Sequence, residues 1–67
     1  MMLHNLQAEM ARNEIRRQDL ANALGITVRT LQNKIYGRTD FTIAEAVKIK
    51  EAFFPDKSLK YLFEKDA

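Results

Sequence analysis

Apolar residues recur at three- and four-residue spacing along most of the chain, which is the period of a helix that buries one face. This pattern predicts five short helices, over about 3–13, 17–24, 28–36, 43–53 and 59–63. Gly25 and Gly37 follow the second and third segments, where glycine takes the left-handed conformation that ends many helices. No segment alternates with the period of two that marks a half-buried strand. We therefore predict an all-α fold.

Side chains that cap helices stand where three of these segments begin. Thr27 and Ser58 are suited to accept a hydrogen bond from an early amide, and Thr42 is followed by Glu45 in the spacing of a capping box. The residues expected on the buried side of the fourth helix are Ile43, Ala46, Val47, Ile49 and Phe53.

Length and composition narrow the possible classes of protein. The 67 residues fit one domain, 1–67, and the 46% hydrophobic content is that of a folded chain. With no cysteine and one histidine, we expect no disulfide, no metal and no cofactor. No apolar run approaches the roughly 18 residues that span a bilayer, and the start has no leader pattern. We therefore expect a cytoplasmic protein without a membrane partner, and a start at Met1 with a charged end at Lys65-Asp66-Ala67 favours a complete small protein.

The positive charge is concentrated in one part of the chain. Residues 12–38 hold six basic and two acidic residues, a net charge of +4, whereas residues 1–11 and 39–67 are each at −1. This asymmetry favours a polyanionic partner that meets one face of the protein.

The same part of the chain contains two short segments joined through Gly25. Ala21 allows the two helices to approach closely, and apolar residues fill the angle between them. The third segment is then left with Arg29, Gln32 and Asn33 pointing outward. Such hydrogen-bonding side chains can read the edges of DNA bases, whereas a merely solvated helix face more often carries Glu and Lys.

The spacing of Leu20-Ala21, Leu24-Gly25-Ile26-Thr27 and Gly37 resembles that of the lambda-repressor-like, Cro-type helix-turn-helix family, also called the xenobiotic-response-element family. The resemblance continues through Phe41-Thr42-Ile43 and Ser58-Leu59 and covers essentially the whole chain. It implies a compact five-helix domain that binds double-stranded operator DNA. The implied function is that of a phage or prophage repressor, without a small-molecule substrate.

The resemblance also implies roles by position. Arg29 is expected to pair with guanine and Val28 to meet a thymine methyl group. The residues expected to contact bases are Val28, Arg29, Gln32 and Asn33, and those expected to contact the DNA backbone are Arg17, Gln18, Thr27, Thr30, Tyr36 and Arg38. Arg17 is equally readable as a solvated residue, Tyr36 as a packing residue and Lys34 as a side chain lying along its helix.

Two positions depart from the family pattern. Arg16-Arg17 stands where Ser or Thr followed by Gln is common, so the usual cap of the second helix is missing. Ile35 stands where many members have Glu, which suggests an apolar contact there, for example with Met10.

The C-terminal third carries more large apolar residues than a small core needs. An exposed apolar patch usually marks a partner surface, and a two-fold homodimer would present two recognition helices to a pseudo-palindromic site. The residues expected at a dimer interface are Phe53, Phe54, Leu59, Tyr61 and Phe63. The alternative is that these rings close the core.

Catalysis has no visible basis in the sequence. Glu9 and Asp19 are isolated carboxylates without an evident partner, and Ser58 has no histidine near it in sequence. We expect no enzymatic activity. The rival to DNA binding is a protein-interaction module, in which an antitoxin-like adaptor uses the same fold to hold a partner protein.

Overall fold

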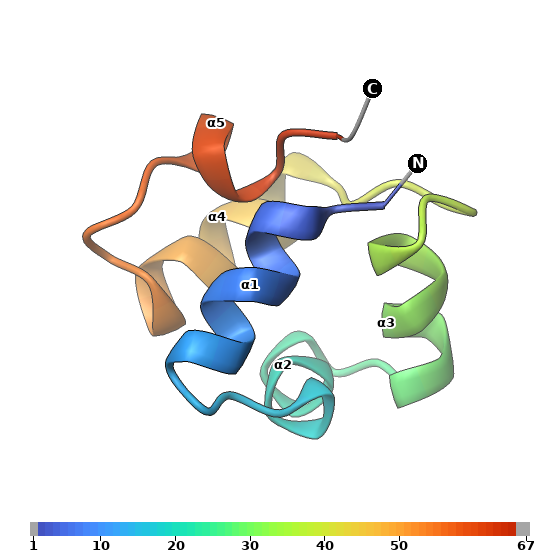
Figure 1. Cartoon of the computed structure of the whole chain (residues 1–67). Coiled ribbons are helices and arrows are strands. Elements are labelled where there is room, and N and C mark those ends of the chain that lie inside the picture. The colour runs from blue at the N-terminus through green and yellow to red at the C-terminus, as the bar shows by residue number, and fades with distance from the viewer. Residues whose placement is uncertain (1, 66–67) are drawn as a thin grey trace.

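The structure, a computed structural model, describes residues 2–65. Met1, Asp66 and Ala67, which entered the expectation of a complete chain, lie outside this range. The described residues form five α-helices and no β-strand: α1 (His4–Arg12), α2 (Arg17–Leu24), α3 (Val28–Ile35), α4 (Ile43–Phe53) and α5 (Leu59–Leu62). Figure 1 shows α1 at the front, α3 at the right-hand side and α5 at the top. The prediction of an all-α fold is confirmed, with boundaries within about two residues of those expected.

The three predicted caps are present. The Thr27 hydroxyl accepts from the Thr30 amide at 3.1 Å, and the Ser58 hydroxyl accepts from the Tyr61 amide at 3.0 Å. At α4 the capping box is complete, because Thr42 accepts from the Glu45 amide at 3.1 Å and Glu45 accepts from the Thr42 amide at 2.9 Å. Each cap satisfies an amide that has no partner within its helix.

The start of α2 is held differently, and this corrects the expectation that Asp19 has no partner. Arg16 occupies the cap position, and an arginine side chain cannot accept a hydrogen bond. Instead, the Asp19 carboxylate accepts from the Arg16 amide at 2.9 Å and from its guanidinium at 3.3 Å. These contacts, the backbone one above all, hold the pKa of Asp19 below its ordinary value.

Helices α1, α2 and α3 end in the same kind of turn. In each case one residue takes a positive φ, which is 55° at Glu14, 70° at Gly25 and 84° at Gly37. The residue after it then donates to a carbonyl five positions earlier, as in a Schellman motif. These bonds are Ile15 N to Met10 O at 2.8 Å, Ile26 N to Ala21 O at 3.0 Å and Arg38 N to Asn33 O at 2.9 Å.

The core is built from all five helices and from the segments on either side of them. Helix α2 packs against α3 and α4, and α5 packs against α1 and α4. Figure 1 shows α2 almost along its axis while α3 runs up the picture, so the two helices cross steeply. The buried apolar residues are Leu3, Leu6, Met10, Leu20, Ala21, Leu31, Ile35, Ile49, Phe54 and Leu62. No helix within residues 2–65 has the length and apolar character needed to cross a membrane.

Two apolar residues lie elsewhere than the first prediction placed them, and for Phe54 the alternative, a ring that closes the core, holds. Phe54 was expected at a dimer interface, but it is 1% exposed, because it follows the last residue of α4 and its ring turns into the core. Ile43 was expected on the buried side of α4, but it is 83% exposed. At about 100° per residue, Ile43 lies about 120° around the helix from Ile49, which is the buried residue of α4.

Candidate nucleic-acid interface

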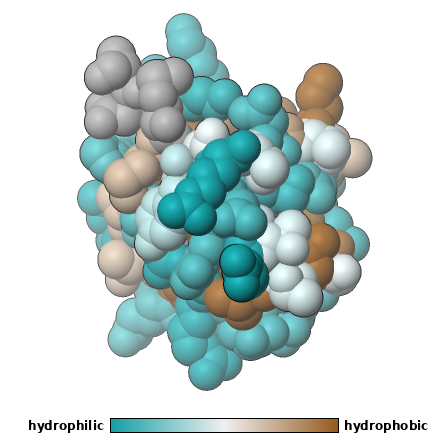
Figure 2. Space-filling model, turned by 90° about the vertical axis from the view of Figure 1, so that its right-hand side faces the viewer, coloured by the Kyte–Doolittle hydropathy of each residue, from teal (hydrophilic) through white to brown (hydrophobic). Residues whose placement is uncertain are grey.

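Helix α3 has one buried side and one side open to solvent. Leu31 and Ile35 are fully buried, and the Leu3 amide donates to the Ile35 carbonyl at 3.0 Å. The core therefore fixes how α3 is rotated about its axis, and its polar residues point outward. Figure 2 looks onto the side of the molecule on which α3 lies and shows mainly hydrophilic side chains there.

Six of the ten residues expected to contact DNA lie around one shallow hollow of about 510 Å³ on this side. Four come from α3 and two from the turn that follows it. They are Val28, Arg29, Gln32, Asn33, Tyr36 and Arg38, and we call this set the α3 face. The structure thus brings together all four expected base-contacting residues.

The polar side chains of the α3 face are engaged to different degrees. Arg38 donates to the Asn33 side-chain oxygen at 3.5 Å, and the Asn33 carbonyl accepts from the amides of Arg38 and Thr39. Arg29 and Gln32 make no side-chain hydrogen bond or ion pair with any residue of the range 2–65. These two side chains carry donors, and Gln32 an acceptor, that an external ligand can use.

The positive charge of residues 12–38 is partly neutralised within the chain. Three of its six basic residues have acidic partners: Arg12 with Glu9, Arg16 with Asp19 and Lys34 with Glu45. The other three, Arg17, Arg29 and Arg38, form no ion pair within the described part of the chain. Because Arg29 and Arg38 both belong to the α3 face, that face keeps a net positive charge.

The remaining expected residues lie outside this hollow. Arg17 lines a separate hollow between α1 and the start of α2, where its Nε atom is buried without a partner. Gln18 donates to the Asn22 side chain at 2.7 Å. The Thr27 hydroxyl donates to the Thr30 hydroxyl at 3.0 Å, so both threonines contribute to the cap of α3. Whether any of these four meets DNA stays a prediction.

Lys34 holds the segment that follows α3, a role that the sequence left open. Its side chain is 13% exposed, and its ammonium group lies 3.0 Å from the Glu45 carboxylate and 3.1 Å from the Asp40 carbonyl. The bond from the Thr42 amide lowers the pKa of Glu45, burial opposes this, and Lys34 lowers it further. The α3 face is therefore anchored at its C-terminal end to the first turn of α4.

The described residues also bear on whether the chain has a metal site. No group of three or more histidine, aspartate or glutamate side chains within residues 2–65 is arranged to hold a metal ion. In comparisons with known proteins, no family model, no curated protein and no solved structure matches the chain. A function for the chain therefore has to be argued from its own residues and geometry.

Proposed function

We propose that this chain is a sequence-specific double-stranded DNA-binding transcriptional regulator with a lambda-repressor-like helix-turn-helix. In this proposal it is a repressor of the phage Cro type, α3 lies in the major groove, and α2 crosses the DNA backbone. The observation that carries the proposal is that Arg29 and Gln32, which have no side-chain partner within residues 2–65, lie on the outward side of a helix whose inward residues Leu31 and Ile35 are fully buried.

The side chains of the α3 face match the donor and acceptor pattern of base edges. Arg29 can donate one hydrogen bond from each of its two terminal nitrogens to the O6 and N7 atoms of guanine, and Gln32 or Asn33 can pair with the N6 and N7 atoms of adenine. Val28 offers only methyl groups, which suit a thymine methyl. Each good bidentate pair contributes about 1–3 kcal/mol of discrimination against a wrong base.

Phosphate contacts supply most of the affinity in this proposal. Arg38 and Tyr36 adjoin the base-reading residues, and Arg17 and Gln18 stand at the start of α2. Neutralising phosphates releases counterions, so binding weakens steeply as salt increases. No cofactor and no chemical step are part of the mechanism.

The first experiment is selection of bound sequences from a random duplex pool at about physiological salt. We expect enrichment of an inverted repeat with half-site centres one helical turn apart, as a dimeric reader of DNA requires. Salt-labile binding without any enriched sequence would contradict the proposal. That result would favour the protein-interaction module. That alternative relies on exposed apolar residues in the C-terminal third of the chain, and Phe54 is not one of them because it is buried in the core.

Arg29 and Arg38 form a matched pair for testing the assigned roles, since both are exposed and each loses one positive charge on substitution by alanine. We expect Arg29→Ala to lose about 1–3 kcal/mol on the selected sequence only, with its preference at one base pair relaxed. We expect Arg38→Ala to weaken binding on all sequences alike and to reduce the slope against log salt by about 0.9. An equal loss on all sequences for Arg29→Ala would make it a phosphate contact.

A further inference from the structure

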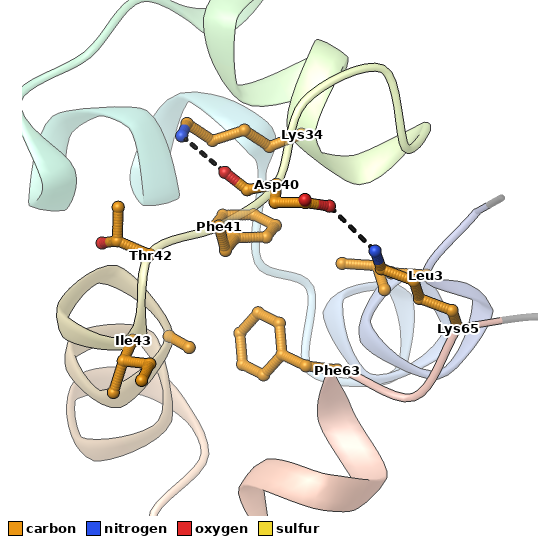
Figure 3. Close-up of a pocket in the computed structure, with 9 residues that line it drawn as sticks. Leu3, Lys34, Asp40, Phe41, Thr42, Ile43, Phe63 and Lys65 are labelled. Carbon is orange, nitrogen blue, oxygen red and sulfur yellow. Dashed lines mark hydrogen bonds and ion pairs between the residues drawn. The ribbon is translucent and has the colours of Figure 1, made fainter.

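A third hollow, of about 340 Å³, lies behind the segment that follows α3. Figure 3 shows the side chains around it, which come from the N-terminal segment, α3, the segment before α4, the start of α4 and the segment after α5. Its apolar walls are Leu3, Phe41, Ala46 and Phe63, and the two rings meet edge to face with centroids 5.2 Å apart. Two large rings and two aliphatic side chains thus border an unfilled space at the surface.

Ile43 stands at the edge of this hollow. At 83% exposed, it is the most exposed of the large hydrophobic side chains that the structure describes. A protruding aliphatic side chain and an apolar hollow therefore lie on the same face of one molecule. Two copies of such a face can pair about a two-fold axis, because each copy then inserts its own side chain into the other's hollow.

The charges around the hollow are compatible with a second copy. The charged residues that line the hollow are Lys34, Asp40 and Lys65; Lys65 pairs with Asp40, and Lys34 is neutralised by Glu45 beside the hollow. Lys65 and Asp40 form an ion pair at 2.8 Å, and both side chains are exposed. Each of them can instead pair with the opposite charge on a facing copy. The α3 face differs, because its two arginines repel the same face of another copy.

We infer that a second copy of this chain docks on this hollow, with Ile43 of each copy seated against Phe41, Ala46 and Phe63 of the other. The inference rests on the proposed function in one respect: on DNA, this contact would hold two copies together so that both α3 faces meet the duplex. The hollow and the α3 face share no residue, so docking leaves Arg29 and Gln32 uncovered. Of the expected interface residues it keeps Phe63 and adds Ile43.

The test compares Ile43→Glu with Ala52→Glu. Both positions are exposed on α4, and each substitution lowers the net charge by one. The two positions are nine residues apart, which puts them on opposite sides of the helix. Sedimentation of the full chain should show that Ile43→Glu weakens dimerisation by about tenfold or more. The effect is large because the two-fold axis places the substitution in the interface twice, once from each copy. Ala52→Glu should leave it unchanged. Equal dimerisation of the two variants would overturn the inference.

A second measurement covers the case of a variant that folds poorly. The chain has no cysteine, so Ile43→Cys and Ala52→Cys each introduce a single reactive thiol. A short bismaleimide should join two copies through position 43 much faster than through position 52, and equal rates would overturn the inference. The inference would also be overturned if sedimentation showed only monomers and a duplex with two selected half-sites bound no dimer. In that case the hollow would be left to a different partner. Binding of one copy to a single half-site would then show that the proposed function stands without this contact.

Discussion

Glu9 makes a buried polar contact that joins α1 to α5, and this contact gives a sharp test of the fold. Its side chain is 1% exposed, and its Oε2 atom accepts from the Arg12 guanidinium at 2.6 Å and from the Tyr61 hydroxyl at 2.9 Å. Its Oε1 atom is buried and has no hydrogen-bond partner in the structure. Glu9 therefore has two partners, against the expectation from the sequence, and one of them lies in α5.

The perturbation is Tyr61→Phe, which removes the hydroxyl and keeps the ring. The Glu9 carboxylate is then left in the core with Arg12 as its only donor. A hydrogen bond to a charged group contributes about 1.5–3 kcal/mol, and little of that is recovered because the buried Glu9 carboxylate cannot reach water. The whole domain is expected to be stable by about 3–10 kcal/mol, so this one bond is a large share. A loss of about 2 kcal/mol corresponds to a fall in Tm of about 8–16 °C at this chain length.

The assay is urea unfolding followed by circular dichroism, with Tyr36→Phe as the matched control. Tyr36 is 38% exposed and Tyr61 36%, and the Tyr36 hydroxyl makes no hydrogen bond within residues 2–65. We expect the control to change the free energy of unfolding by less than about 0.5 kcal/mol. A double-mutant cycle with Glu9→Gln should give a coupling energy of about 0.5–3 kcal/mol. If Tyr61→Phe destabilises no more than Tyr36→Phe, the bond between Tyr61 and Glu9 does not hold α5 to α1.

Three further predictions concern acid stability and the helix-ending turns. The pKa of Glu45 is lowered below its ordinary value of 4.5, so its contribution to stability is present above pH 4.5 and is lost as the pH falls through the folded pKa. Glu45→Gln should therefore lower the free energy of unfolding by about 0.5–1 kcal/mol at pH 7, and the Tm of the variant should fall less steeply below pH 4.5. If the Tm of the variant falls with acid as steeply as that of the parent chain, Glu45 does not contribute to acid unfolding. Gly25→Ala should cost about 1 kcal/mol through its φ of 70° alone, because nothing lies within 4 Å of the added Cβ. Glu14→Gly should stabilise by up to about 1 kcal/mol for the same reason at a φ of 55°. Urea unfolding measures both, and equal signs would contradict a conformational origin.

The parts of the fold that were predicted from sequence are those with a local cause. Thr27, Thr42 and Ser58 cap their helices as expected, because a cap needs only a hydroxyl and the amide three residues later. Gly25 and Gly37 marked two helix ends for an equally local reason. The end of α1 uses the same turn with Glu14 in the left-handed position, and no local signal distinguishes that glutamate from any other.

The parts that were missed depend on contacts between distant residues or on the rotation of a helix. Tyr61 lies 52 residues from Glu9, so nothing near Glu9 in the sequence reveals its partner. Ile43 was missed although the signal was present, since its angle to Ile49 around α4 already places it off the buried side. The sequence did not decide between the interface and the core for Phe54, because this residue lies beyond the end of α4, where helical spacing no longer tells which way a ring points.

The expected base-contacting residues came together on one face because a helix fixes their relative positions once its buried side is known. Leu31 and Ile35 identify that side, and Arg29 and Gln32 then follow from the geometry of the helix. The bond between Tyr61 and Glu9 acts elsewhere, between α5 and α1, and contributes no residue to the α3 face. Under the proposed function, base reading by the α3 face and the fastening of α5 to α1 are therefore separable. Well below its melting temperature, Tyr61→Phe should select the same DNA sequence as the parent chain, whereas Arg29→Ala should relax the selected sequence at one base pair while leaving the Tm almost unaltered.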